Sequence, residues 1–213
     1  MRPTPIALRP GNVNPPDAAG WRTIVAQLAD ASLPGLARTR DLLGVTMAKT
    51  TLNGVPGYIL KPRTIPPAHA NQVIYNIHGG GYVYGPGESG MAEAILMAGI
   101  GGYKVIAVDY CMPPYPAAMD DAMAGYKAVL AMTDAQHVGV VGTSTGGGMA
   151  PALMLRAKRE GVPLPAAMAP GTPWSDLTET GDSDKTNEWL DNVLVSYSGT
   201  CRTRQPCTRP GMT

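Results

Sequence analysis

The chain has 213 residues with a net charge of +1, and charged residues make up only 15% of it. This length predicts a single domain with a sizeable core, and the nearly neutral balance gives no electrostatic case for nucleic-acid binding. The 44% content of hydrophobic residues excludes a disordered chain. No apolar run is long enough to span a membrane, no signal peptide is recognised, and the three cysteines predict no disulfide framework, so we expect a cytoplasmic protein.

The first predicted element is a helix that begins after Asp17 and ends near Ala31. Its apolar residues recur at helical spacing, namely Trp21, Ile24, Val25 and Leu28. Pro34-Gly35 then predicts a break in the chain. This helix either packs on the main domain or forms part of a cap over a pocket.

Two antiparallel strands, Val45–Leu52 and Gly57–Lys61, are predicted next, joined at the turn dipeptide Asn53-Gly54. Strands and helices alternate after this hairpin. The further predicted strands are Gln72–Ile77, Lys104–Asp109, Val138–Val141 and Ala166–Ala169. The helices between them are Glu88–Gly99, Ala117–Met132 and a segment from about Gly147 to Glu160. This order predicts an α/β fold with a mostly parallel sheet and helices on both faces.

A G-x-S-x-G motif, Gly142-Thr143-Ser144-Thr145-Gly146, lies between the strand at Val138–Val141 and the following helix. This context is that of a nucleophile elbow, in which a sharp turn strains the serine backbone and exposes its Oγ. We expect glycines on both sides of Ser144 because a Cβ there would collide with the neighbouring strand or helix. The amide of Thr145 would point toward developing negative charge. A glycine-rich turn is the alternative, whereas the lysine of a phosphate loop and the dinucleotide-binding motif are both absent.

A second motif, His78-Gly79-Gly80-Gly81, follows the strand that ends at Ile77. An HGGG loop completes the oxyanion hole of lipases and esterases. Glycines let its backbone turn N–H groups toward a substrate oxygen without obstruction. The two motifs together predict an acyl hydrolase, and we expect neither a cofactor nor a metal ion.

Several segments together resemble the hormone-sensitive-lipase-like group of bacterial esterases, the family IV lipolytic enzymes. They are HGGGYVYG at 78–85, VDY around Asp109, YPAAMDDAMAGYKAVL at 115–130, GTSTGG at 142–147 and PWSDLTETGDS at 173–183. The resemblance covers most of residues 17–199. It implies an α/β-hydrolase fold that acts on short- to medium-chain acyl esters. It also implies a helical cap at residues 1–44, a core at 45–180 and a second cap segment at 181–199.

The resemblance also implies a role for each matching residue. Ser144 is similar to the nucleophile, and the amides of Gly80, Gly81 and Thr145 are similar to the oxyanion hole. His78, Gly79 and Asp109 are similar to residues that support the loop, so His78 is not expected to act as the catalytic base.

The triad of this fold runs serine, acid, histidine along the chain, but all three histidines, His69, His78 and His137, precede Ser144. Residues 200–213 also depart from the family. We therefore expect that the last strands, the triad acid and the triad histidine are missing, through truncation or a frameshift near Gly199. The chain as given would then be impaired. Two alternatives remain: a pseudoenzyme that binds a ligand, and an inactive product whose exposed apolar edge favours aggregation or a homodimer.

Two smaller departures from the family pattern accompany these. Pro151 falls inside the helix that follows Ser144, where it removes a backbone hydrogen bond at a cost of roughly 3 kcal/mol. Cys111 stands where the family usually has arginine. Both are also compatible with neutral drift.

Overall fold

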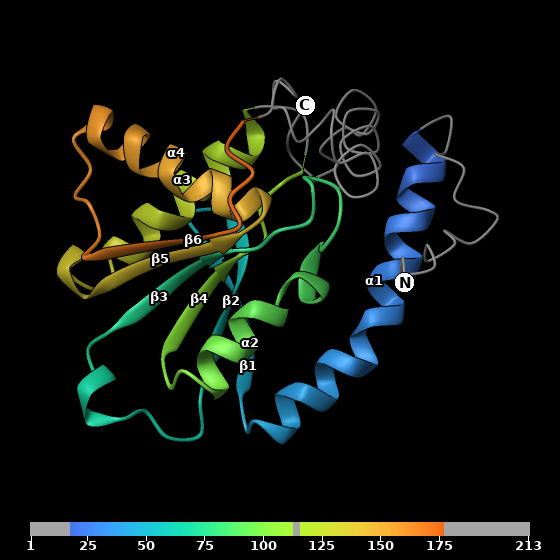
Figure 1. Ribbon diagram of the computed structural model, residues 1–213, viewed down its shortest axis with the longest axis horizontal. Helices are drawn as coiled ribbons and strands as arrows, with labels where there is room; N and C mark the ends of the chain where they lie inside the picture. The colour runs from blue at the N-terminus through green and yellow to red at the C-terminus, as the bar shows by residue number, and fades with distance from the viewer. Residues whose placement is uncertain (1–17, 113–115, 177–213) are drawn as a thin grey trace, which may run out of the picture.

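The computed structural model describes residues 18–112 and 116–176. Within them, six strands form one sheet in the order β1-β2-β4-β3-β5-β6 (Figure 1). The strands are β1 Thr46–Leu52, β2 Val55–Lys61, β3 Val73–Ile77, β4 Lys104–Val108, β5 Val138–Thr143 and β6 Ala167–Gly171. The helices are α1 Ala18–Leu42, α2 Ala92–Gly99, α3 Ala117–Leu130 and α4 Thr145–Glu160, with 3₁₀ turns η1 Pro67–His69, η2 Gly87–Gly90 and η3 Ala135–His137. The predicted order of strands and helices is confirmed.

The hairpin is the antiparallel part of the sheet, as predicted. Leu52 of β1 lies opposite Val55 of β2, and both turn residues have positive φ, 49° at Asn53 and 86° at Gly54. Positive φ at both positions is the type I′ geometry that joins two strands most tightly. β2 is also antiparallel to β4, whereas β4, β3, β5 and β6 run parallel. The parallel strands therefore bring their carboxyl ends to one edge of the sheet.

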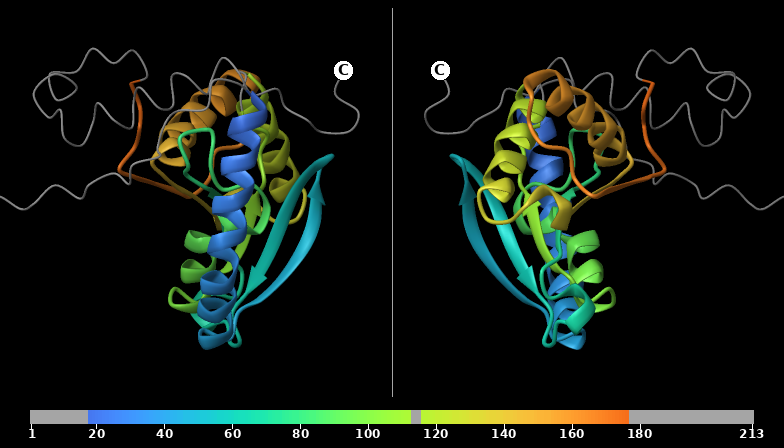
Figure 2. Two further views of the ribbon diagram at one scale, coloured as in Figure 1. Left: turned by 90° about the vertical axis from the view of Figure 1, so that its right-hand side faces the viewer. Right: turned by 90° about the vertical axis from the view of Figure 1, so that its left-hand side faces the viewer.

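Both faces of the sheet are covered by helices (Figure 2). The side chains of β4 alternate between the two sides, as a strand with two buried faces requires. Ile106 and Val108 join the cluster under α3 and α4, and Val105 and Ala107 join the cluster under α2. The long helix α1 packs outside α2 and η2.

Helix α1 corrects the sequence prediction, because it runs through Pro34 and Gly35 instead of ending near Ala31. Packing on both sides of the proline explains this. Trp21 is fully buried against Val83 in a small cluster at one end of the helix, and Leu36 packs against the α2 cluster beyond the proline. The helix changes direction along its length (Figure 1), as expected when a proline removes one backbone hydrogen bond. Asp17, its predicted cap, lies outside the described residues.

Helix α4 likewise continues through its internal proline, Pro151.

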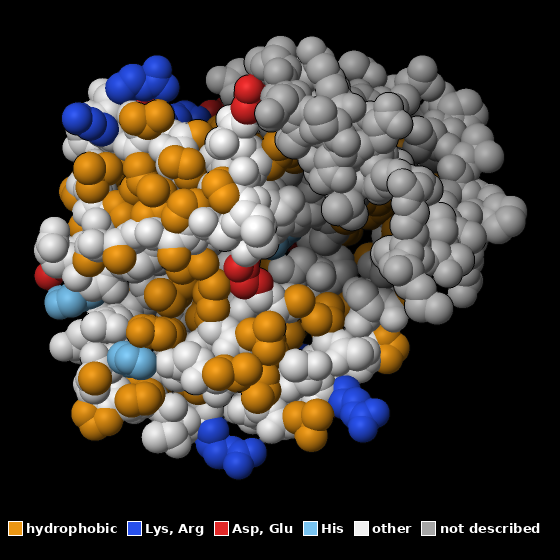
Figure 3. Space-filling model, in the orientation of Figure 1, with side chains coloured by type: hydrophobic (Ala, Val, Ile, Leu, Met, Phe, Trp, Pro, Cys, Tyr) orange, Lys and Arg blue, Asp and Glu red, His pale blue; other side chains and the backbone are white. Residues whose placement is uncertain are grey.

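Strand β6 forms the edge of the described sheet, and apolar side chains lie exposed beside it. Leu155 of α4 is 66% exposed, Leu164 43% and Met168 of β6 40%. Apolar side chains gather over this end of the molecule in Figure 3. The expectation of a homodimer depends on this edge and stays a prediction.

The structure bears on the expectations about membrane spans and disulfides. No helix in the described ranges is long and apolar enough to cross a membrane. Cys111 is disulfide-bonded, so the expectation from the cysteine count did not anticipate this bond.

Candidate active site

Ser144 lies at the turn between β5 and α4 with a backbone conformation that side chains rarely adopt, φ 58° and ψ −118°. Three hydrogen bonds hold it there. Its amide donates to the carbonyl of Gly171 at 3.0 Å, and its own carbonyl accepts from Gly148 at 2.9 Å and from Trp174 at 3.0 Å. Such a conformation costs about 1–3 kcal/mol and persists only where the surroundings impose it. The strained serine turn predicted from the motif is therefore present.

The glycines on either side of Ser144 are explained by the close packing of the turn. A Cβ on Gly142 would lie 2.5 Å from the carbonyl oxygen of Gly146 in α4 and 2.6 Å from that of Ile77 in β3. A Cβ on Gly146 would collide with the same Ile77 oxygen. The steric reason given for these two glycines is confirmed, and their absence of side chains brings the start of α4 against the end of β3.

The glycine loop after β3 begins directly beside the serine. A Cβ on Gly79 would lie 2.6 Å from the carbonyl oxygen of Thr143 and 3.3 Å from the Cβ of Ser144. The next residues have positive φ, 130° at Gly80 and 64° at Gly81. The carbonyl of Gly80 accepts the amides of Val83 and Tyr84 at 2.9 and 2.8 Å, which closes the loop into a tight turn.

This turn leaves backbone donors available. No backbone carbonyl in the described ranges accepts the amide of Gly80 or Gly81, and no heavy atom outside its chain neighbours lies within 4 Å of a Cβ built on Gly81. Thr145 is the first residue of α4, so its amide is one of those that a helix leaves without an internal partner. The helix dipole adds partial positive charge at this end. The structure thus brings Ser144 beside the start of the glycine loop and the start of α4, and the amides of Gly80, Gly81 and Thr145 have no backbone acceptor among the described residues.

His78 packs against the segment that follows the glycine loop, where a Cβ on Gly85 or Gly90 would lie 3.1 or 3.0 Å from its ring. Its ring is buried and stacks on Tyr110 with ring centroids 4.3 Å apart, and its Nδ1 lies 2.7 Å from the carbonyl oxygen of Gly79. A carbonyl only accepts, so Nδ1 carries the hydrogen and Nε2 is bare. Nε2 is buried without a hydrogen-bond partner among the described residues. Burial lowers the pKa of His78, so its neutral form holds the first turn of the loop.

Two aspartates fix the segments around this histidine. Asp109, at the carboxyl end of β4, accepts the amide of Gly87 at 2.9 Å, which ties the start of η2, after the glycine loop, to the sheet. Asp121 of α3 is buried and accepts the amide of Cys111 at 2.7 Å. Burial raises the pKa of the Tyr110 phenol, which therefore stays protonated. Its hydroxyl donates a hydrogen bond to the carbonyl of His78 at 2.9 Å. Asp109 was anticipated as loop support, whereas Asp121, although it lies in the family-like segment YPAAMDDAMAGYKAVL, was given no role.

Two further arrangements near the elbow were not predicted. Tyr82 of the glycine loop and Trp174 after β6 place their rings 6.3 Å apart at a tilt of 37°. On the other side of the sheet, Glu93 of α2 bonds both Asn76 of β3 and Thr143 of β5. Both arrangements join segments far apart in sequence, and no local sequence pattern predicts such contacts.

The other two histidines lie at the opposite edge of the sheet. His137 precedes β5 and Ser144 follows it, so a strand of six residues, roughly 20 Å long, separates them. His69 precedes β3 and stacks on Tyr103 with ring centroids 4.0 Å apart. Neither can act as a base for Ser144 in this arrangement.

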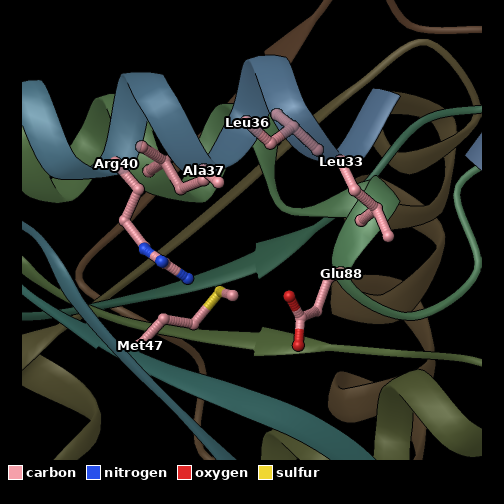
Figure 4. A pocket seen from close by; sticks show the side chains of 7 residues that line it. Leu33, Leu36, Ala37, Arg40, Met47 and Glu88 are labelled. Atoms are coloured by element: carbon pink, nitrogen blue, oxygen red, sulfur yellow. The ribbon is translucent and has the colours of Figure 1, made fainter. Parts of the chain in front are cut away.

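A small hollow beneath α1 is separate from the serine site. Arg40 and Met47 from one side and Glu88 from the other point toward it (Figure 4). Its remaining lining residues are Leu33, Leu36, Ala37 and Ile95. Within the described part of the chain, no group of three or more His, Cys, Asp or Glu side chains is close enough to hold a metal ion.

Comparison with known proteins places this geometry in a family. The family described as alpha/beta hydrolase fold matches residues 74–204. The esterase E25, a solved structure, superposes with a TM-score of 0.83 at 32% identity over 94% of this chain and 62% of its own. An esterase from the bacterial hormone-sensitive lipase family superposes with a TM-score of 0.67 at 26% identity, over 81% of this chain and 62% of its own. The chain therefore belongs to the α/β-hydrolase fold family, in its hormone-sensitive-lipase-like group, as the motifs had indicated.

Among curated proteins, the chain is similar to the acetyl-hydrolase of Streptomyces hygroscopicus. The two are 32% identical over 133 residues, which are 61% of this chain and 44% of the relative. An esterase of Acinetobacter venetianus is 33% identical over 67% of this chain and 47% of its own length. The chain thus spans about half the length of the curated relatives it matches.

Proposed function

We propose that this chain acts on carboxylic esters of short to medium acyl length, with Ser144 as nucleophile. The amides of Gly80, Gly81 and Thr145 form the oxyanion hole. The observation that carries the proposal is the approach of two segments far apart in sequence. The strained Ser144 and the start of the glycine loop lie so close that Gly79 has no room for a side chain.

In the proposed reaction, Ser144 Oγ attacks the ester carbonyl carbon and loses its proton to a base. The carbonyl oxygen becomes an oxyanion that accepts hydrogen bonds from the three amides. The ester C–O bond then breaks and the alcohol leaves with a proton, which gives an acyl-serine. A water molecule attacks the acyl-serine in the same way, releasing the carboxylic acid and restoring Ser144.

The neighbourhood of the site supports a small acyl group as substrate. Tyr82 follows the two proposed oxyanion glycines, and Trp174 donates its amide to the carbonyl of Ser144, so the backbones of both aromatic residues adjoin the proposed site, and their rings lie 6.3 Å apart. Aromatic rings favour burial of an apolar substituent. Two relatives are named for acetyl esters, an acetyl-hydrolase and an ethyl acetate hydrolase of Pseudomonas putida.

The 213 residues hold no histidine in position to take the proton of Ser144. Loss of a triad member typically lowers the rate by about 10⁴–10⁶, while the oxyanion hole and binding leave about 10³ over water. We therefore propose that this chain turns esters over slowly. The test is hydrolysis of p-nitrophenyl butyrate by purified chain of verified mass, beside the Ser144→Ala variant. Slow hydrolysis that disappears in the variant supports the proposal, and robust turnover would refute the impairment.

A ligand-binding pseudoenzyme is the second candidate, and the position of the histidines favours it. Such a protein would bind an ester at the same site without hydrolysing it. The two candidates differ in covalent labelling by a fluorophosphonate. A hydrolase site acquires an adduct on Ser144, whereas a binding protein holds the ester reversibly and acquires none.

A further inference from the structure

We propose that Glu93 is a positioning residue for the nucleophile elbow, acting through Thr143. This inference rests on the proposed function of Ser144, and it adds a residue that no motif or resemblance indicated. Glu93 lies in the first turn of α2, whereas Ser144 lies beyond β5. Its carboxylate is the feature that joins them.

The two oxygens of Glu93 bond different strands. Oε2 accepts the side-chain amide of Asn76 in β3 at 3.0 Å, and Oε1 accepts the hydroxyl of Thr143 in β5. Asn76 is fully buried, and its Nδ2 also lies 3.4 Å from the carbonyl oxygen of Val141 in β5. One carboxylate therefore crosslinks β3 and β5 close to the edge where both strands end.

These two strands deliver the two halves of the proposed site. β3 ends at Ile77 and leads into the glycine loop, and β5 ends at Thr143, the residue before Ser144. A shift of one strand relative to the other would move the loop amides away from the serine Oγ. Hydrogen bonds to a charged group are the strongest of the ordinary ones, and here they are partly shielded from solvent.

The hydroxyl of Thr143 thus has a function beyond filling space. Apart from the hydroxyl, valine has the same shape as threonine, so Thr143→Val removes the bond and keeps the packing. Thr143→Ser keeps the hydroxyl and loses a methyl group. Glu93→Gln presents one NH₂ group where two donors require an acceptor, so it loses at least one of the two bonds.

The test uses a reporter that needs no catalytic base. In a Ser144→Cys background of the full chain, the thiolate reacts with iodoacetamide directly. The alkylation of the peptide that contains position 144 is followed by mass spectrometry as a function of pH. A thiol held at the start of α4 beside free amides has an apparent pKa below the ordinary value of about 8.5.

If Glu93 positions the elbow, both Thr143→Val and Glu93→Gln raise this thiol pKa toward its ordinary value. Both also slow alkylation at pH 7 by about tenfold, the factor that corresponds to one charged hydrogen bond. For Glu93→Gln, the direction of the change in thiol pKa distinguishes loss of charge from displacement of the thiol. Removal of a nearby negative charge would by itself lower the thiol pKa, so only displacement of the thiol from the amides raises it. Thr143→Ser is expected to retain the behaviour of the parent.

Tyr126→Phe is the matched control, because it removes a hydroxyl bond of 2.8 Å to the carbonyl of Pro163 on the other side of the sheet. It is expected to leave the thiol unchanged while altering the melting temperature. A thiol pKa that stays constant or falls in either Thr143→Val or Glu93→Gln overturns the proposal for Glu93. A parent thiol with an unperturbed pKa would instead contradict the proposed function of Ser144 itself.

Discussion

The carbonyl oxygen of Ile77 occupies the space that a Cβ on Gly146 would need. The second atom in the way is the carbonyl oxygen of His78, 2.7 Å from the same Cβ position. Both obstacles are backbone, so neither can turn aside as a flexible side chain would. The close contact between the end of β3 and the start of α4 therefore requires that residue 146 has no side chain.

Gly146→Ala is expected to lower the free energy of unfolding by about 3 kcal/mol, because overpacking against backbone forces the strand and helix apart. The measurement is urea denaturation followed by circular dichroism. Gly35→Ala is the matched control, since Gly35 is exposed within α1 and, apart from the surrounding helix backbone, no heavy atom of the described residues lies within 4 Å of its Cβ position. That change should stabilise the chain by about 0.5–1 kcal/mol. Equal effects of the two substitutions would contradict the packing argument.

The strain at Ser144 predicts that removing its side chain stabilises the fold. Its φ of 58° and ψ of −118° suit glycine far better than any other residue. Ser144→Gly is therefore expected to unfold at higher urea concentration than Ser144→Ala, by about 1 kcal/mol in the free energy of unfolding. Both variants lack the hydroxyl, so the comparison isolates the backbone. A more stable alanine variant would show that the turn carries no strain.

Because His78 is buried in its neutral form, the fold is expected to lose stability in mild acid. Burial lowers its pKa from the ordinary 6.5, so the folded chain keeps the ring neutral while the unfolded chain protonates it. Unfolding then takes up a proton, and this contribution to stability, complete above pH 6.5, is lost as the pH falls toward the lowered pKa. His78→Gln should reduce the difference in unfolding free energy between pH 7.5 and pH 5.5, which lie about one unit either side of 6.5. The exposed His137→Gln variant is the control, and an identical reduction in both would refute the assignment.

Much of this architecture was predictable because it depends on local chemistry. The turn at Asn53-Gly54 needs two residues that tolerate positive φ, and the sequence supplies both. The elbow at Ser144 was recognisable because its flanking glycines have a steric cause that does not depend on the rest of the fold.

The elements that could not be predicted depend on tertiary contacts. Pro34 does not end α1, since apolar side chains before and after it pack against the domain and outweigh one lost hydrogen bond. Pro151 is tolerated in α4 in the same way. The carboxylate of Glu93 meets Thr143 only because α2, packed on β4 and β2, brings its first turn beside the ends of β3 and β5, and spacing along the chain does not reveal this.

The central claim is that Ser144 faces the amides of the glycine loop and is chemically reactive there. The most direct test is incubation of the purified full chain with a fluorophosphonate, followed by mass analysis of the peptides. The account predicts a slowly formed adduct on the peptide that contains Ser144, absent from the Ser144→Ala variant. No adduct at all, or an adduct on a different residue, would contradict it.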